Sequence, residues 1–201
     1  MRIFLAGASG VIGVRLVALL VADGHTVAGM TRTASKADAL TQAGAEPVVC
    51  DVFDADALRA AVAAFAPDLV MHQLTDLPDD ASRISDYGQR NDRIRREGTR
   101  NLLDAAADAG VRGARFLAQS IAWELPGERG EHNRAFERMV LDAGGVIIRY
   151  GQLYGPDTYY PDEPPPPPRV HVDEAARATV GLLDAEPGVV AVVEPDAKGP
   201  Q

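Results

Sequence analysis

The chain of 201 residues has one cysteine, two lysines and no long uninterrupted apolar run. A single cysteine, Cys50, excludes an internal disulfide framework and favours a reducing compartment. The apolar runs stay below the roughly 18 residues that span a bilayer, and the first residues lack a signal-peptide pattern. We therefore expect a cytoplasmic protein that does not bind or cross a membrane.

Basic residues are in the minority. Lysine and arginine number 20 against 29 aspartates and glutamates, which gives a net charge of −9. This balance opposes nonspecific binding to nucleic acid and to anionic membranes. Four histidines and one cysteine are too dispersed to predict a metal site. With 46% hydrophobic residues the chain can still bury one good core, so we expect a single domain.

Three glycines follow the first apolar run of the chain. Gly7, Gly10 and Gly13 stand between a predicted strand at 2–6 and a predicted helix at 11–23. Such a turn lets backbone approach a ligand closely, and free amides at the helix start point at an anion. We interpret it as a pyrophosphate site. A tight strand-to-helix connection without a ligand needs the same glycines, and that alternative stays open.

The end of the second predicted strand indicates which dinucleotide binds. In a dinucleotide-binding fold, an acidic residue at this position favours NAD, whereas a cation accommodates the 2′-phosphate of NADP. No acidic residue lies between Thr26 and Ala37, and Arg32 and Lys36 stand there with Ser35. The sequence therefore predicts NADP(H) in preference to NAD(H). The alternative is that these cations only begin a solvated surface helix.

Strand-like and helix-like segments alternate along the chain. The predicted strands are 2–6, 25–31, 46–51, 68–73, 114–119, 145–150 and 189–194, and the predicted helices are 11–23, 35–43, 54–65, 86–109, 131–143 and 173–185. This alternation predicts an α/β fold, a Rossmann-like doubly wound parallel sheet with ligands at the carboxyl ends of the strands. We expect a dinucleotide-binding core at 1–158, a stiff, extended proline-rich connector at 159–169, and a strand and helix at 170–201 that return to the core.

These motifs together resemble the short-chain dehydrogenase/reductase superfamily, in its NAD(P)-dependent epimerase/dehydratase branch. The resemblance rests on Gly7-Ala8-Ser9-Gly10-Val11-Ile12-Gly13, Asp51-Val52, Asn101-Leu102-Leu103-Asp104-Ala105, Arg149-Tyr150-Gly151 and His171-Val172-Asp173-Glu174-Ala175-Ala176. It implies that Asp51 contacts adenine, that Gln73 and Leu74 offer backbone contacts, and that two helices per subunit, near 86–109 and 131–143, form a homodimer. The predicted cofactor-binding residues are Gly7, Ser9, Gly10, Val11, Ile12, Gly13, Thr31, Arg32, Ser35, Lys36, Asp51, Val52, Gln73, Leu74 and Thr75.

Two features depart from that family. Its enzymes use a Tyr-x-x-x-Lys pair, yet the lysines of this chain are Lys36 and Lys198, so the pair is missing. Aligning Glu137 with the acidic residue after the motif puts Arg129 and Asn133 in its place. The proline-rich connector also stands where extended members carry a substrate-binding portion. We expect the lid over the substrate to be lost or supplied by another subunit.

The resemblance places the family's serine at Ser120, where a fixed hydroxyl can donate to a developing oxyanion. Tyr154 is the second catalytic candidate, as an un-ionised phenol that donates a proton. The alternative, that Tyr154 only packs under the cofactor ribose, stays open. We predict an atypical NADP(H)-binding oxidoreductase that acts on a small-molecule substrate with a non-standard proton donor. Two alternatives stay open: a non-redox isomerase, cyclase or lyase on the same fold, and an inactive module that senses NAD(P) or binds a partner.

Overall fold

A parallel sheet of seven strands forms the centre of the computed structural model, which describes residues 1–78 and 80–195. The strand order is β3-β2-β1-β4-β5-β6-β9, and every neighbouring pair is parallel. The chain winds outward from β1 in one direction to β3 and, from β4, in the other direction to β9. This arrangement is the predicted doubly wound Rossmann-like fold.

The predicted strands all occur, with ends within two residues of the prediction. The strands are β1 (Arg2–Ala6), β2 (Thr26–Thr31), β3 (Glu46–Val49), β4 (Leu69–His72), β5 (Phe116–Ile121), β6 (Val146–Tyr150), β7 (Gln152–Tyr154), β8 (Arg169–His171) and β9 (Gly188–Val192). The helices are α1 (Val11–Ala22), α2 (Ala37–Gln42), α3 (Ala55–Phe65), α4 (Gly88–Arg93), α5 (Thr99–Asp108), α6 (Gly127–Asp142) and α7 (Val172–Val180).

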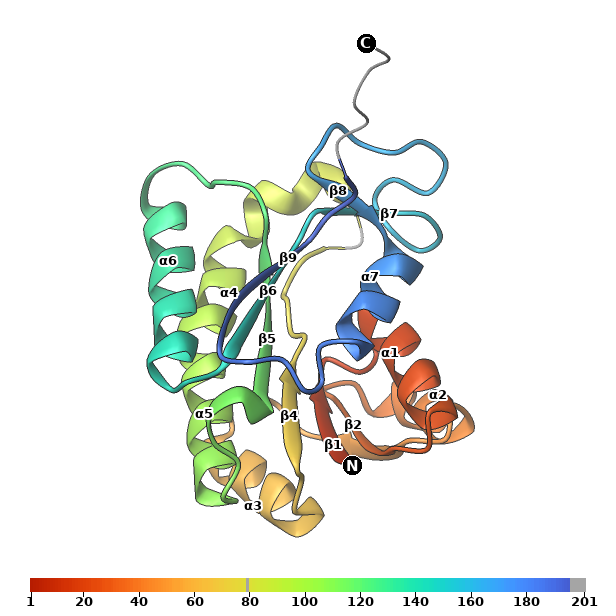
Figure 1. Ribbon diagram of the computed structural model, residues 1–201, viewed down its shortest axis with the longest axis vertical. Helices are drawn as coiled ribbons and strands as arrows, with labels where there is room; N and C mark the ends of the chain where they lie inside the picture. The colour runs from red at the N-terminus through yellow and green to blue at the C-terminus, as the bar shows by residue number, and fades with distance from the viewer. Residues whose placement is uncertain (79, 196–201) are drawn as a thin grey trace.

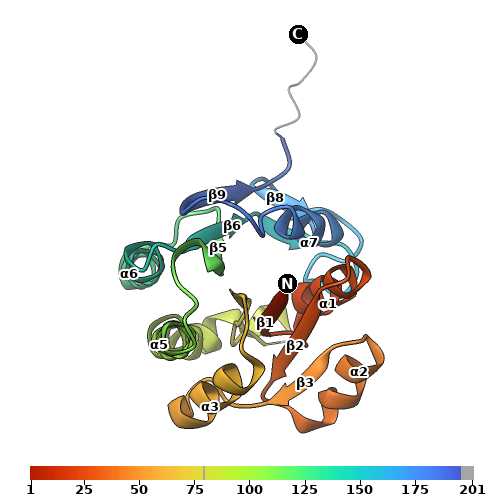
Figure 2. The same cartoon turned by 60° about the horizontal axis from the view of Figure 1, so that its bottom comes forward.

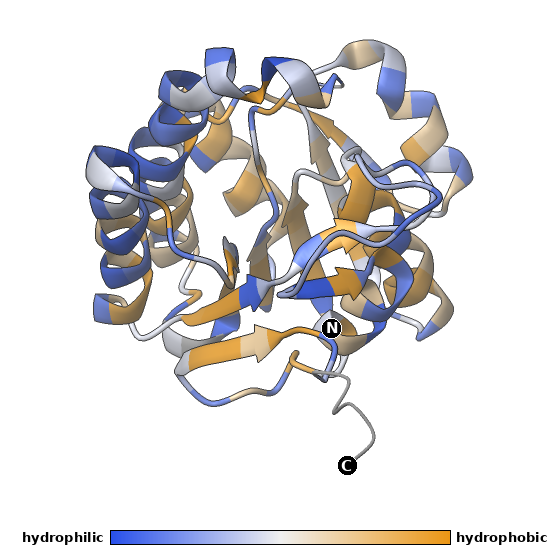
Figure 3. Ribbon diagram, turned by 90° about the horizontal axis from the view of Figure 1, so that it is seen from above, coloured by the Kyte–Doolittle hydropathy of each residue, from blue (hydrophilic) through white to orange (hydrophobic). Residues whose placement is uncertain are grey.

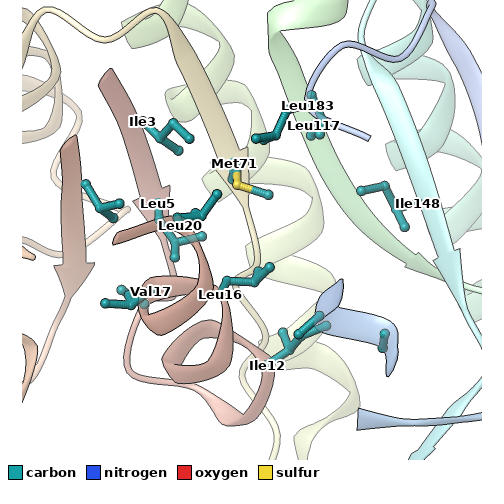
Figure 4. Close-up of a cluster of buried hydrophobic side chains, with 14 of the residues drawn as sticks. Ile3, Leu5, Ile12, Leu16, Val17, Leu20, Met71, Leu117, Ile148 and Leu183 are labelled. Carbon is teal, nitrogen blue, oxygen red and sulfur yellow. The ribbon is translucent and has the colours of Figure 1, made fainter. Parts of the chain in front are cut away.

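Helices cover both faces of the sheet. α1, α2 and α7 lie on one side, and α3, α4, α5 and α6 lie on the other (Figure 1, Figure 2). Under α1 and α7, Leu16 and Leu20 pack with Met71 and Ile148 in one buried cluster (Figure 4). Phe136 belongs to the cluster on the opposite face. The strands are accordingly apolar and the outer helix faces polar, as Figure 3 shows, because a parallel sheet is buried on both faces.

Three predicted helices differ from the structure. The segment 86–109 is divided into α4, a π-helical turn at Ile94–Gly98, and α5. The helix predicted at 131–143 begins earlier, at Gly127. The prediction missed its first turn because that turn is polar and carries no apolar periodicity. The helix predicted at 173–185 ends at Val180, with Gly181 at its C-terminal cap.

The proline-rich segment is not straight. It bends at 161–163 and again at 166–168, where an extended connector was predicted. Hydrogen bonds to its carbonyl oxygens hold the bends: Gln152 donates to Pro168 over 2.9 Å, and Arg169 Nη1 donates to Pro165 over 2.9 Å. Contacts with the small sheet of β7 and β8 therefore shape this segment more than proline's own preference does.

Arg15 connects the first helix to the last third of the chain. Its Nε donates to Asp173 of α7 over 2.7 Å, and its Nη2 donates to the Pro156 carbonyl over 2.9 Å. The Arg15 side chain is 15% exposed, and its bond to Asp173 is partly buried. In residues 1–78 and 80–195, no helix is both long and apolar enough to span a membrane.

Candidate functional site

The glycine turn between β1 and α1 is packed against backbone on two sides. Gly7 has φ of +92°, and a Cβ there would lie 2.5 Å from the Gln73 carbonyl oxygen. A Cβ on Gly13 would lie 2.1 Å from the Gly7 carbonyl oxygen. Tight packing thus requires both glycines whether or not a ligand binds. Gly10 is different, because its Cβ would meet the Gly7 oxygen only at 3.3 Å.

The start of α1 offers free hydrogen-bond donors. Gly10 occupies the N-cap, no side chain caps the helix, and its first turn has no acidic residue. The first amides of a helix, here those of Val11, Ile12 and Gly13, have no intrahelical acceptor, and the helix dipole adds positive charge at this end. The turn therefore fits the pyrophosphate of a dinucleotide on both shape and charge.

At the end of β2, the structure pairs Arg32 with a buried carboxylate. Arg32 Nη2 lies 3.1 Å from Asp76 Oδ1, and Arg90 Nε lies 3.0 Å from Asp76 Oδ2. Burial alone would raise the pKa of Asp76, but hydrogen bonds from the two arginines hold it below its usual value. Two guanidiniums thus share one carboxylate, and both are about half exposed.

Other predicted cofactor residues surround this corner. Ser9 and Thr31 share a hydrogen bond of 2.9 Å between their hydroxyls. Ser35 and Lys36 are exposed in the short 3₁₀ helix that follows Arg32. The Ser35 hydroxyl and a second cation, Lys36, therefore follow Arg32 closely in the chain.

The remaining predicted cofactor residues follow β3 and β4. Asp51 is exposed and accepts a hydrogen bond of 3.0 Å from the Phe53 amide. Val52 is buried, whereas Leu74 is half-buried and Thr75 is exposed. The Gln73 carboxamide is buried with no hydrogen-bond partner at bonding geometry in the described part of the chain, although it helps to offset the rise that burial causes in the pKa of Tyr150. These residues all lie at the carboxyl edge of the parallel strands.

Ser120 lies at the end of β5 in a buried polar network. Its hydroxyl donates to Glu137 Oε1 over 2.6 Å, and Arg149 binds the same carboxylate through Nη2 at 2.6 Å. Burial would raise the pKa of Glu137, but its bonds to Arg149 and Ser120 hold it below the usual value. Asn133, one turn before Glu137 on α6, reaches Ser120 Oγ at 3.5 Å. The Ser120 hydroxyl is thus fixed in place by an ionised carboxylate.

The second catalytic candidate, Tyr154, lies on β7 in the small sheet. Its hydroxyl donates to Glu194 Oε1, and its ring meets the His171 ring edge-on at a centroid distance of 5.2 Å. The hydrogen bond to Glu194 raises the pKa of Tyr154, so the phenol keeps its proton at neutral pH. Glu194 also accepts from Arg169 at 3.1 Å. This environment matches an un-ionised phenol.

His72, which ends β4, is a structural residue whose charge state affects stability. Its Nδ1 accepts from the Leu74 amide at 3.3 Å, so the proton sits on Nε2 and is donated to Thr99 Oγ1 at 2.9 Å. Burial lowers its pKa from 6.5 to about 3. The unfolded chain then binds a proton below pH 6.5 that the folded protein does not bind until about pH 3.

We therefore expect the free energy of unfolding to fall as the pH falls from 6.5 to 3. At pH 5 the loss due to His72 is about 2 kcal/mol. Urea denaturation of His72→Gln across this range should show a shallower pH dependence than the wild type, and His25→Gln, at a half-buried histidine, is the control. An unchanged slope in His72→Gln would contradict this account.

Fold and site together define a dinucleotide-binding Rossmann protein. The chain belongs to the NAD(P)H-binding family, whose model matches residues 7–144. A curated relative, the 3-diazoavenalumate denitrifying reductase of a Streptomyces species, is 34% identical across 92% of this chain and 73% of its own length.

Two solved structures share the fold. The UDP-glucose 4-epimerase of Thermus thermophilus, solved with NAD, superposes with a TM-score of 0.77 at 21% identity, over 96% of this chain and 78% of that one. ChuY, an anaerobillin reductase from Escherichia coli O157:H7, gives a TM-score of 0.73 at 20% identity over 100% of both chains. At these identities the likeness shows the fold alone.

Asp76, Arg90 and Arg95 are site residues that sequence reasoning missed. Arg90 on α4 binds Asp76, and Arg95 on the π-helical turn Ile94–Gly98 is only 9% exposed. Hydropathy gives no signal for the contacts of Asp76, because its partner Arg32 is 44 residues away in the chain. Only the fold brings them together.

Proposed function

We propose that this protein is an NADP(H)-dependent reductase of a small-molecule substrate. The observation that carries the proposal is the uncapped start of α1 behind the glycine turn, together with Arg32 after β2 and Arg90 on α4, which share Asp76. The Streptomyces relative, a reductase by name, supports the direction of the reaction. An epimerase-like or other non-redox activity on the same fold is the alternative.

The residues present fit NADP(H). The amides after Gly10 would hold the pyrophosphate, Asp51 would meet the adenine, and Arg32 with Ser35 and Lys36 would hold the 2′-phosphate. Arg32 would then share its guanidinium between Asp76 and the phosphate, a planar fork that suits both. When bound, NADPH supplies a hydride to the substrate.

Two hydroxyls are proposed to act on the reacting group. Ser120, oriented by Glu137, would donate a hydrogen bond to an oxyanion, and Asn133 would support it from the next turn of α6. Tyr154, held protonated by Glu194, is the candidate proton donor. The family's tyrosine is activated by lysine, whereas here the phenol would act in its neutral form.

Fluorescence titration with NADPH and NADH tests the cofactor. We expect NADPH to bind in the micromolar range and Arg32→Ala to weaken it by about tenfold or more, because a charge-assisted contact with phosphate is lost. NADH binding should change little, and Arg112→Ala, at an exposed arginine away from the site, should match the wild type. Equal affinity for both dinucleotides, or no binding, would argue against this function.

A dinucleotide-sensing module is the second candidate. Two observations favour it: the Tyr-x-x-x-Lys pair is missing, and the Ser120 hydroxyl already donates its hydrogen bond to Glu137. It predicts binding of both NADP⁺ and NADPH without NADPH oxidation by any substrate.

A homodimer through α4, α5 and α6 is proposed for either function, and sedimentation velocity should then give twice the mass of the 21.3 kDa chain.

A further inference from the structure

Arg95 is a buried cation beside the proposed catalytic residues. The π-helical turn Ile94–Gly98 turns it inward, where it is 9% exposed. One nitrogen, Nη1, donates to Asn133 Oδ1, and the guanidinium lies 5.8 Å from the centre of the Phe136 ring. π-helical turns inside helices recur at functional sites. The Asn133 carboxamide thus links Arg95, which donates to its Oδ1, to Ser120, whose Oγ lies 3.5 Å from its Nδ2.

Within residues 1–78 and 80–195, Arg95 forms no ion pair within 4.0 Å. The two carboxylates that influence it are already engaged, Glu137 with Arg149 at 2.6 Å and Asp92 with His132 at 3.0 Å. Burial accordingly lowers the pKa of Arg95. A buried charge without a partner is costly, so an arrangement of this kind calls for an anionic ligand.

A second arginine lies close by. Arg129 is one turn before Asn133 on α6, and its Nε is buried without a hydrogen-bond partner in the described part of the chain. Its guanidinium packs over Gly88, where a Cβ would lie 3.3 Å from the Arg129 Cζ. Its charge also acts on Arg95. Two under-used guanidiniums therefore flank Asn133, and Arg129 and Asn133 themselves stand where the resemblance places the family's tyrosine and lysine.

We propose that Arg95 and Arg129 bind a carboxylate of the substrate beside Ser120. A carboxylate is planar and carries one charge, which matches the fork of a guanidinium and the single unmet charge of Arg95. The proposal rests on the proposed function, since it names the substrate class of the same site. It makes this protein a reductase of small organic acids.

The test titrates benzoate into the protein without dinucleotide and measures binding by calorimetry. Benzamide, which has the same ring and no charge, is the matched ligand. The variants are Arg95→Gln, Arg95→Lys and Arg129→Gln, with Arg96→Gln, at the exposed neighbour on the same turn, as the control. Circular dichroism checks that each variant folds.

We expect benzoate to bind at least about tenfold more tightly than benzamide, and Arg95→Gln and Arg129→Gln each to weaken benzoate about tenfold. Arg95→Lys should restore part of the affinity, and Arg96→Gln should leave it unchanged. Equal binding of the two ligands, no benzoate binding, unaffected binding in Arg95→Gln, or tighter binding of inorganic phosphate would overturn the proposal. If Arg95→Gln does not fold, the ligand pair and Arg129→Gln decide.

Because no dinucleotide is present, this result is independent of the cofactor. Benzoate binding with no NADPH binding would retain the carboxylate site and reject the reductase. NADPH binding without benzoate binding would retain the reductase and reject the carboxylate site. Benzoate should bind Arg32→Ala as it binds the wild type, which separates the Arg95 site from the phosphate-binding corner.

Discussion

Gly13→Ala is expected to lower the free energy of unfolding by about 3 kcal/mol or more and to remove NADPH binding. The added methyl would lie 2.1 Å from the Gly7 carbonyl oxygen and 2.9 Å from Ala8 backbone atoms. Backbone cannot rotate away as a side chain can, so α1 must shift relative to the turn. Urea denaturation followed by circular dichroism and NADPH fluorescence measure the two effects.

Gly10→Ala is the matched control in the same turn. Its φ is −83°, an ordinary angle for any residue, and its methyl would approach the Gly7 oxygen only to 3.3 Å. We expect a change of about 1 kcal/mol or less there. A Gly13→Ala protein as stable as Gly10→Ala would mean that the turn is looser than the structure shows.

Glu137→Ala is expected to cost about 3 kcal/mol or more of folding free energy. The carboxylate is 6% exposed and satisfies both the Ser120 hydroxyl and the Arg149 guanidinium. Its removal leaves the buried hydroxyl without its acceptor and takes away one of the two carboxylates that influence Arg95. Thermal and urea denaturation measure the loss.

The matched control is Glu131→Ala, at an exposed glutamate on the same helix, which should stay within about 0.5 kcal/mol of the wild type. Because the pKa of Glu137 is held below its usual value, its contribution is present above that value and is lost as the pH falls through the lowered pKa. A Glu137→Ala protein with wild-type stability would show that the network is not held together by this carboxylate.

The sequence predicted the sheet well, because its strands depend on local patterns. Buried parallel strands are continuous apolar runs, and strand ends of such a sheet meet at one edge. The start of α3 is local in the same sense, because Asp54 directly precedes the helix and its side chain accepts from the Ala57 amide at 3.1 Å. These features need no knowledge of distant contacts.

The electrostatics of the site could not be predicted in the same way. The partners of Ser120 and Arg95 lie on α6, 17 and 38 residues further along the chain. A π-helical turn has no apolar period of its own, so an arginine that it turns inward looks like a surface residue. The sequence does not distinguish an exposed charged residue from a buried one, because tertiary packing decides which side chains are buried.

The bonds of Arg15 have a consequence for how the molecule comes apart. They tie the helix that bears the glycine turn to Asp173 and to the Pro156 carbonyl, while β9 pairs with β6 inside the main sheet. The last third of the chain therefore cannot open by itself without breaking contacts of the first helix. We therefore expect the glycine turn and β9 to open together, and native-state hydrogen exchange should then give the two a shared opening free energy.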